Sequence, residues 1–226
     1  MTEFLSHRLS SATPAYGGQI SFERQIKSSI SSGQNSNSFS FSMSNHLGTH
    51  IDFPKHFVNS GKSLNDYPSS FWVNRRALFI EIPCELGQLI KSSDVEFAMK
   101  KIKSVAFEER DTLLVRTSFE KLRQTDQYWS SNPGFLPEVA SFLKEKYPNI
   151  QILGMDTISL TSYLHREIGR EAHRAFLEAE VGEPILLLED MKLSPASSPV
   201  IELTVLPLCI EDADGAPCTA VGRWNT

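Results

Sequence analysis

A cluster of imidazole and carboxylate side chains lies between residues 45 and 57 of the 226-residue chain. Its members are His46, His50, Asp52 and His56, and the whole chain contains only six histidines. All four occupy even positions, and alternate residues of an extended segment project from one face. An extended run from 50 to 56 would therefore group the polar side chains and send Ile51 and Phe53 into a core. Imidazole and carboxylate on one face, beside the backbone kink at Pro54, can form a site for a divalent metal ion.

Other interpretations of this segment remain open. The spacing H-x-x-x-H also occurs in metal-binding helices, although Gly48, Pro54 and the β-branched residues argue against a helix here. The four polar side chains could instead form a solvated face without function. If they are buried, however, their polar atoms need partners. His46, His50 and Asp52 could then be three metal ligands, and His56 a further ligand or a general base.

A second group of candidate residues lies further along the chain. His173 falls in the later half of a helical pattern, and Glu189 ends an apolar strand, where a side chain can emerge at the edge of a sheet. Either residue alone is commonly just solvated. With the first cluster they form a candidate second half of the site, in which Asp52 bridges two ions. His165 and His7 are expected to be exposed and without a role.

Aromatic residues near these clusters are candidates for a substrate pocket. Tyr16 lies on a loop between Thr13-Pro14 and Gly17-Gly18. It could cover the core or form a pocket wall, and Phe57 could form another wall.

Composition limits the class of protein. A hydrophobic content of 40% in 226 residues suffices for one large domain or two small ones, and the lack of a linker or repeat favours a single domain over 1–226. The formal net charge of −5 and the lack of a basic run argue against a nucleic-acid partner. There is no signal-peptide pattern and no membrane-spanning run. The three widely spaced cysteines are typical of free thiols in a reducing compartment, which favours the cytoplasm.

Apolar runs of strand type alternate with amphipathic helical patterns, which favours an α/β fold. Strands are expected at 39–44 (half-buried), 76–84, 112–117, 150–155, 184–189, 200–210 (one strand or a pair) and 216–221. Helices are expected at 91–103 (capped by Ser92 or Ser93), 137–147 and 163–180. The segment 20–30 could be a strand or a short helix.

Residues 46–56, HLGTHIDFPKH, resemble the motif H-x-G-T-H-x-D-x-P-x-H of the cyclase-like metal-dependent hydrolases, a family that includes bacterial kynurenine formamidase and isatin hydrolase. The likeness extends over most of the chain, through segments 9–18, 154–157, 173–175, 187–190 and 214–217. The resemblance implies a swivelling β/β/α fold with a barrel-like mixed sheet flanked by helices. It also implies a small-molecule substrate and a homodimer or homotetramer.

The resemblance further implies one or two divalent ions per subunit, zinc or manganese. The residues that match the family's ligands are His46, His50 and Asp52 and, where a second ion binds, His173 and Glu189, with Asp52 shared. The match to His56 acts in acid–base catalysis.

Two departures from the family pattern stand out. The interval from His173 to Glu189 is longer than usual, which makes Glu183 a rival ligand. Tyr16 stands where formamidases commonly have Trp, and Cys218-Thr219 follows Ala216-Pro217 where the family often has an arginine. These substitutions weaken a claim to kynurenine specificity.

The resulting hypothesis is hydrolysis of an amide, formamide or lactam C–N bond by metal-activated water, with His56 passing a proton to the leaving nitrogen. The alternatives are a metal-dependent cyclase or dehydratase, a lactone hydrolase, and a metal- or small-molecule-binding protein without turnover. His56 beside three intact ligands favours an enzyme, because a binding protein needs no base.

Overall fold

The computed structural model describes residues 1–19, 22–102, 105–179 and 182–225. Its centre is a mixed sheet with the strand order β1-β12-β11-β5-β7-β9-β10-β4. Because β4 also pairs with β12, every strand of this sheet except β1 belongs to a closed barrel. The strands are β1 (Thr2–Phe4), β4 (His50–Asp52), β5 (Arg75–Glu81), β7 (Thr112–Arg116), β9 (Ile152–Met155), β10 (Leu186–Glu189), β11 (Val200–Pro207) and β12 (Gly215–Arg223). Neighbours among β5, β7, β9 and β10 run parallel, and the other pairs are antiparallel.

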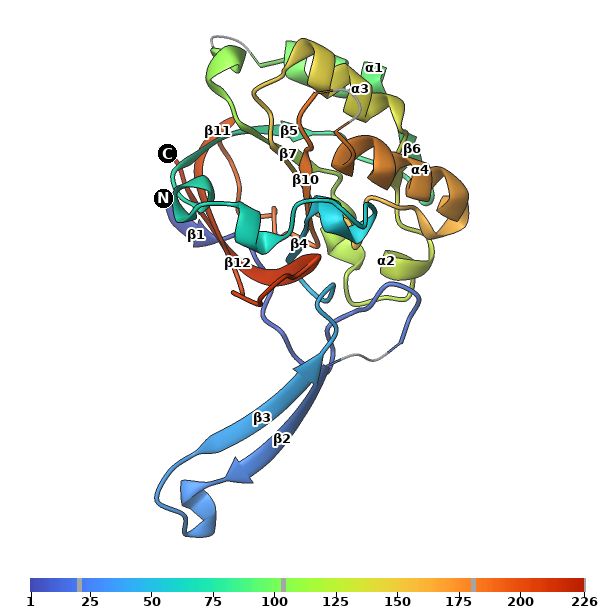
Figure 1. The fold of residues 1–226 in the computed structure, drawn as a ribbon. Coiled ribbons are helices and arrows are strands. Elements are labelled where there is room, and N and C mark those ends of the chain that lie inside the picture. Colours follow the sequence, from blue (N-terminus) through green and yellow to red (C-terminus); the bar gives the residue numbers. More distant parts are fainter. Residues whose placement is uncertain (20–21, 103–104, 180–181, 226) are drawn as a thin grey trace.

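Three helices lie together over one side of the barrel, beside its parallel strands (Figure 1). They are α1 (Ser92–Lys100), α3 (Glu138–Lys146) and α4 (Arg166–Leu177). The shorter elements are α2 (Gln127–Ser130), the pair β6 (Leu89–Ile90) and β8 (Gly134–Phe135), and the 3-10 turns η1 (Ile30–Ser32), η2 (Pro54–His56), η3 (Leu64–Asp66), η4 (Ser69–Trp72), η5 (Phe107–Glu109), η6 (Phe119–Leu122) and η7 (Tyr163–His165).

The parallel strands are buried on both faces. In β7, Leu113 and Val115 pack with the helices, whereas Leu114 packs inside the barrel. This double burial explains the continuous apolar runs of these strands. Gly154 of β9 also faces the interior, where a Cβ would come within 2.6 Å of both Leu114 and Met191. The barrel is therefore filled by side chains, and a ligand site has to lie outside it.

The predicted α/β class, with a barrel-like mixed sheet flanked by helices, is confirmed. The strands expected at 76–84, 112–117, 150–155, 184–189 and 216–221 and the three helices are present, with ends that differ by a few residues. The run 200–210 is a single strand. Within 20–30 the structure has a strand, β2 (Phe22–Ser28), and positions 20–21, 103 and 180 of the expected elements lie outside the described residues.

Three local expectations were wrong. The extended segment from 50 ends at Asp52, because Pro54 fixes φ and opens the turn η2. Helix α1 is capped by carboxylates instead of serine: Asp94 accepts from the Lys91 amide, and Glu138 accepts from the Ser92 amide.

The third correction concerns the strand at 39–44. It is β3 (Ser38–Met43), which pairs with β2 in a hairpin, but most of it is exposed. The hairpin projects away from the barrel, so nothing in the described chain covers the outer part of its apolar face (Figure 1).

No helix of the described chain combines the length and the apolar character needed to cross a membrane.

Candidate metal centre

Strand β4 brings the first cluster to the outer surface of the barrel. It lies between β10 and β12, with His50 opposite Glu189 and Asp52 opposite Leu187. Ile51 points into the barrel core, so its two neighbours project to the other side. Residues directly opposite on paired strands share a face, which puts the Glu189 carboxylate beside His50. All three polar side chains are buried, at 3% exposure or less.

The backbone before β4 fixes the orientation of the His50 ring. Gly48 has φ of +69°, and a Cβ there would lie 2.5 Å from the Leu9 side chain. In this conformation the Gly48 carbonyl lies 2.8 Å from Nδ1 of His50 and accepts its proton. Nε2 of His50 then faces Asp52 Oδ1 and Glu189 Oε2, at 3.4 Å from each. A ring nitrogen held by a carbonyl leaves the other nitrogen as the metal-facing atom.

Helix α4 presents His173 in the same way. Nδ1 of His173 lies 2.9 Å from the Gly169 carbonyl and 3.0 Å from Thr161 Oγ1. Its Nε2 lies 3.5 Å from Glu189 Oε1 and 3.8 Å from Asp52 Oδ2.

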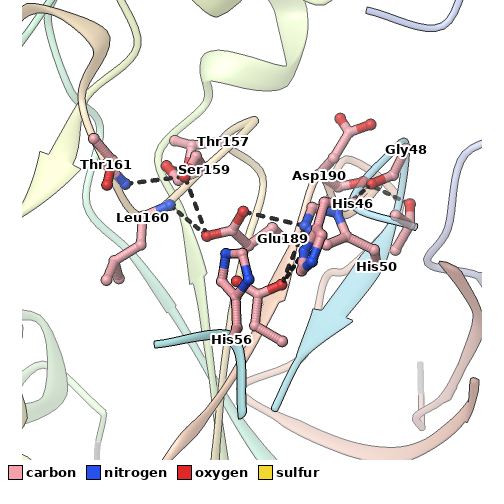
Figure 2. Close-up of polar contacts among 12 residues, drawn as sticks. His46, Gly48, His50, His56, Thr157, Ser159, Leu160, Thr161, Glu189 and Asp190 are labelled. Atoms are coloured by element: carbon pink, nitrogen blue, oxygen red, sulfur yellow. Dashed lines mark hydrogen bonds and ion pairs between the residues drawn. The ribbon is translucent and has the colours of Figure 1, made fainter. Parts of the chain in front are cut away.

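The loop after β9 holds the Glu189 carboxylate. The Leu160 amide donates to Glu189 Oε1 at 2.7 Å, and Ser159 Oγ donates to the same oxygen at 3.3 Å. Figure 2 shows this carboxylate between His50 and the segment that carries Ser159 and Leu160. The carboxylate is thus fixed by donors on one side and faces the histidines on the other.

His46 and His56 meet at a second carboxylate, Asp214. His46 lies 2.8 Å from Asp52 Oδ1 through Nδ1 and 3.1 Å from Asp214 Oδ2 through Nε2. Nδ1 of His56 lies 3.0 Å from the same Asp214 oxygen. Asn45 donates to the other oxygen of Asp214 at 2.8 Å. No role at the site was predicted for Asp214 from the sequence, although it lies in the segment 214–217 that resembles the family's closing strands.

The donor atoms form two sets that share Asp52. One set is His46, Asp52 and His56; the other is His50, Asp52 and Glu189; within each, one atom per residue lies within 4.8 Å of the others. Three or more nitrogen and carboxylate donors at this spacing suit a divalent transition metal. The residues present therefore fit one or two such ions.

Charge pairing dominates this buried group of side chains. Burial lowers the pKa of His50, but the hydrogen bond to Asp52 and the charge of Glu189 outweigh it and raise the value to about 9. Burial likewise raises the Asp52 pKa, yet the hydrogen bonds from His46 and His50 hold it well below its usual range. Metal binding at this site must displace protons from imidazole.

A cavity of about 290 Å³ opens onto these donors. Every predicted site residue lines it: His46, His50, Asp52, His56, His173, Glu189, Tyr16 and Phe57. The Phe57 ring stacks on His173 with centroids 4.7 Å apart. Ile158, Ser159, Thr161, Arg166 and Arg170 also line the cavity and were not expected from the sequence. A larger hollow of about 1040 Å³ lies at the base of the β2–β3 hairpin, away from the donors, so chemistry and not size identifies the site.

The remaining candidates lie elsewhere. Glu183 is exposed, lies 3.4 Å from Lys62, and does not line the cavity. His165 is exposed in η7, as expected. The expectation for His7 was wrong: it is half-buried, because its amide is held by Thr49 beside the barrel.

Known proteins resemble this chain in sequence and in fold. A family model described as "Putative cyclase" matches residues 4–162. A kynurenine formamidase of Bacillus cereus is 29% identical over 220 residues, covering 97% of this chain and 95% of the relative. Another from a second Bacillus cereus strain is 30% identical over 206 residues, covering 91% and 86%.

Solved structures share the fold. Isatin hydrolase A from Labrenzia aggregata, bound to benzyl benzoate, superposes with a TM-score of 0.82 at 21% identity, covering 98% of this chain and 93% of that one. A predicted metal-dependent hydrolase from Bacillus stearothermophilus gives 0.75 at 17% identity, covering 98% and 97%. Since the family model spans well over half of the chain, the chain belongs to the cyclase family of metal-dependent hydrolases.

Proposed function

We propose that this protein hydrolyses the C–N bond of a non-peptide amide, either a formamide or a lactam. The observation that carries the proposal is a buried histidine–carboxylate donor set with His56 on the wall of the same cavity. The relatives' names support both substrate types, because kynurenine formamidase acts on a formamide and isatin is a cyclic amide.

The proposed cofactor is zinc or manganese, one or two ions per subunit. As the family resemblance implies, His46, His50 and Asp52 would hold the first ion, and Asp52, His173 and Glu189 the second. The donor sets of this structure differ in that His46 lies with His56, and His50 with Glu189, around the shared Asp52. A bound divalent ion supplies a Lewis acid for the carbonyl and lowers the pKa of water toward neutrality.

His56 is the proposed acid–base group. Its Nδ1 is held by Asp214, which leaves Nε2 to accept a proton from the attacking water and return it to the leaving nitrogen. A carboxylate behind the imidazole fixes its orientation and stabilises the charged form, as in other Asp–His pairs. Tyr16 and Phe57 form walls of the cavity and are the proposed contacts for the substrate.

A substrate panel tests this proposal. Metal-loaded protein is expected to hydrolyse aryl formamides or isatin, with products heavier than the substrate by one water. His56→Asn is expected to lower kcat by roughly 10²-fold or more. Because His56 also belongs to one donor set, the metal content of the variant is measured alongside, and loss of the metal would make His56 a ligand. A product without added water would indicate a cyclase or dehydratase. Turnover confined to lactones would indicate a lactone hydrolase. Metal binding without turnover on the whole panel would indicate a binding protein.

We also propose that the single domain over 1–226 assembles as a homodimer or homotetramer in the cytoplasm. The apolar face of the projecting hairpin supports self-association. All three cysteines are unpaired, which is consistent with a reducing compartment.

A further inference from the structure

One face of α4 carries two arginines in addition to His173. Arg166, Arg170 and His173 are separated by four and three residues, so they project from the same side of the helix. His173 points to the metal donors, and both arginines line the same cavity. The helix therefore brings positive charge to the wall of a site whose other charged groups are carboxylates and imidazoles.

Arg166 lies at the mouth of the cavity against an aromatic cluster. Its side chain is exposed, and its guanidinium carbon lies 5.3 Å from the centroid of Tyr163. The Tyr163 ring in turn contacts Tyr16 edge to face, with centroids 5.5 Å apart. Stacking on an aromatic face orders a guanidinium while its N–H groups stay available.

The Tyr16 hydroxyl provides a second donor at this wall. It is buried and makes no hydrogen bond of ordinary geometry among the described residues, and the Arg166 guanidinium lies close enough to interact with it. Burial raises the pKa of Tyr16 to about 12, so the phenol stays protonated at neutral pH and can donate. A buried hydroxyl without a partner is costly unless a ligand or water bonds to it.

The two arginines differ in their ion pairs. Arg170 is paired with Glu167 on the same helix. Across the described parts of the chain, no carboxylate lies within ion-pair distance of Arg166. The cavity's own carboxylates, Asp52 and Glu189, already face histidines. The Arg166 guanidinium is thus placed to bind an anionic group of a ligand.

We propose that Arg166 and the Tyr16 hydroxyl form an anion subsite at the mouth of the metal cavity. The preferred substrate is then an amide that carries a carboxylate at a distance from the scissile carbonyl. This inference rests on the proposed function and specifies its substrate class.

A matched pair of substrates tests the subsite: 2-formamidophenylacetate and its methyl ester, with metal-loaded enzyme. Arg166→Gln is expected to lower kcat/KM about tenfold for the acid, as for a lost charged hydrogen bond. For the neutral ester the change should stay within about twofold. For the acid, the kcat/KM of Arg166→Lys should lie between those of wild type and Arg166→Gln, because lysine keeps the positive charge but lacks the paired N–H donors of the guanidinium. Arg174→Gln is the control, because Arg174 is exposed on the same helix and does not line the cavity.

A binding measurement keeps the subsite testable apart from turnover. Calorimetric titration of 2-aminophenylacetate, the expected product, should show about tenfold weaker binding to Arg166→Gln than to wild type. Equal losses for acid and ester, or unchanged product binding, would overturn the subsite. Failure of wild type to hydrolyse either substrate would instead count against the proposed function, and the titration would still decide on Arg166.

Discussion

Asp52 lies at the centre of the histidine cluster. It is buried, and three imidazoles approach its carboxylate, with nitrogen–oxygen distances of 2.8 Å for His46, 3.4 Å for His50 and 3.8 Å for His173. Three histidines around one buried carboxylate exceed what charge balance in a metal-free core requires. The proposed site, in which two ions would share Asp52, would account for this arrangement, since both donor sets include Asp52.

Glu189 and Glu183 give a direct test of the downstream ligand. Glu189→Gln should lose metal affinity by at least about tenfold, because even partners that only orient a ligand are worth that much. Glu183→Gln is the matched control: the same change, six residues earlier, on an exposed side chain paired with Lys62. Metal content after dialysis and the apparent Kd for zinc measure the outcome. Loss of metal in Glu183→Gln alone would reverse the ligand assignment.

The alternation of side chains along an extended segment predicted one part of this site and missed another. It put His50 and Asp52 on one face, which is correct because both lie in β4. It could not find Asp214, whose contacts with His46 and His56 span 168 and 158 residues and exist only because β12 closes the barrel against β4. The place of Arg166 in the cavity wall could not be predicted either, since a helical pattern in the sequence does not tell which site the helix faces.

At the scale of elements, the contact between α4 and the loop after β9 controls the position of His173. A Cβ on Gly169 would lie 2.3 Å from Thr161 Cγ2 and 2.4 Å from Thr161 Oγ1, the atom that also contacts His173. Alanine favours a helix over glycine by about 1 kcal/mol, whereas overpacking costs about 1–3 kcal/mol. We therefore expect the steric cost of an alanine at position 169 to exceed the free energy that it gains from its higher helix propensity.

Gly169→Ala is accordingly expected to lower Tm and to weaken metal binding. Glu171→Ala, at an exposed position of the same helix, reports the helix propensity without the clash. Thermal unfolding and zinc titration of both variants measure the two effects. A raised Tm with unchanged zinc affinity in Gly169→Ala would contradict the packing argument.

The ends of β7 and β9 are joined by a buried carboxyl outside the metal site. Asp156 Oδ1 accepts hydrogen bonds from the Thr117 amide at 2.7 Å and from the Thr117 hydroxyl at 2.6 Å. Burial raises the pKa of Asp156 to about 6 despite these donors. The folded state therefore holds this proton more tightly than the unfolded state does, and stability from Asp156 falls as pH rises from about 4 through about 6.

Asp156→Asn should remove this pH dependence. The free energy of unfolding of wild type, relative to the variant, is expected to decrease between pH 4.5 and 7.5 by about 2 kcal/mol. Urea unfolding of both proteins across this pH range measures the difference in the free energy of unfolding. Groups that titrate in the same way in both proteins do not contribute to this difference. A difference that is constant with pH would show that Asp156 is ionised throughout.

The lengths of the elements explain which of them could be predicted from the sequence. The apolar runs of β5 and β7 are long enough to carry their own signal. Strands β1, β4 and β6 have three residues or fewer, and they are strands only because a partner lies beside them. The strand at 39–44 had the correct alternation, but alternation does not tell whether a core exists to cover the apolar face.

At the scale of the whole molecule, the hairpin presents an apolar face that the barrel does not cover. The register places Arg24 opposite Phe41 and Ile26 opposite Phe39, so these side chains share one face, and Ser40 and Ser42 lie on the other. Ile26, Phe39 and Phe41 are 68%, 51% and 53% exposed. A two-stranded hairpin is marginal alone in water, and large exposed apolar patches mark interaction sites.

A complementary surface lies on the same chain. The hollow at the base of the hairpin is lined by Phe4, Leu206 and Leu208, all more than half exposed, together with Phe41 and Met43. Since both surfaces belong to one chain, a two-fold axis can place each hairpin in the hollow of the other copy. A second copy is therefore the partner that we expect on this face.

The double variant Phe39→Ser, Phe41→Ser is expected to shift the protein from dimer to monomer, because it removes two exposed aromatic side chains from the apolar face of the hairpin. The matched control, Ser40→Thr with Ser42→Thr, changes the opposite face of the same strand and should stay dimeric. Sedimentation equilibrium measures the mass, and far-UV circular dichroism checks that each variant is folded. A wild-type monomer, or a double variant that stays dimeric, would show that the hairpin does not join two copies.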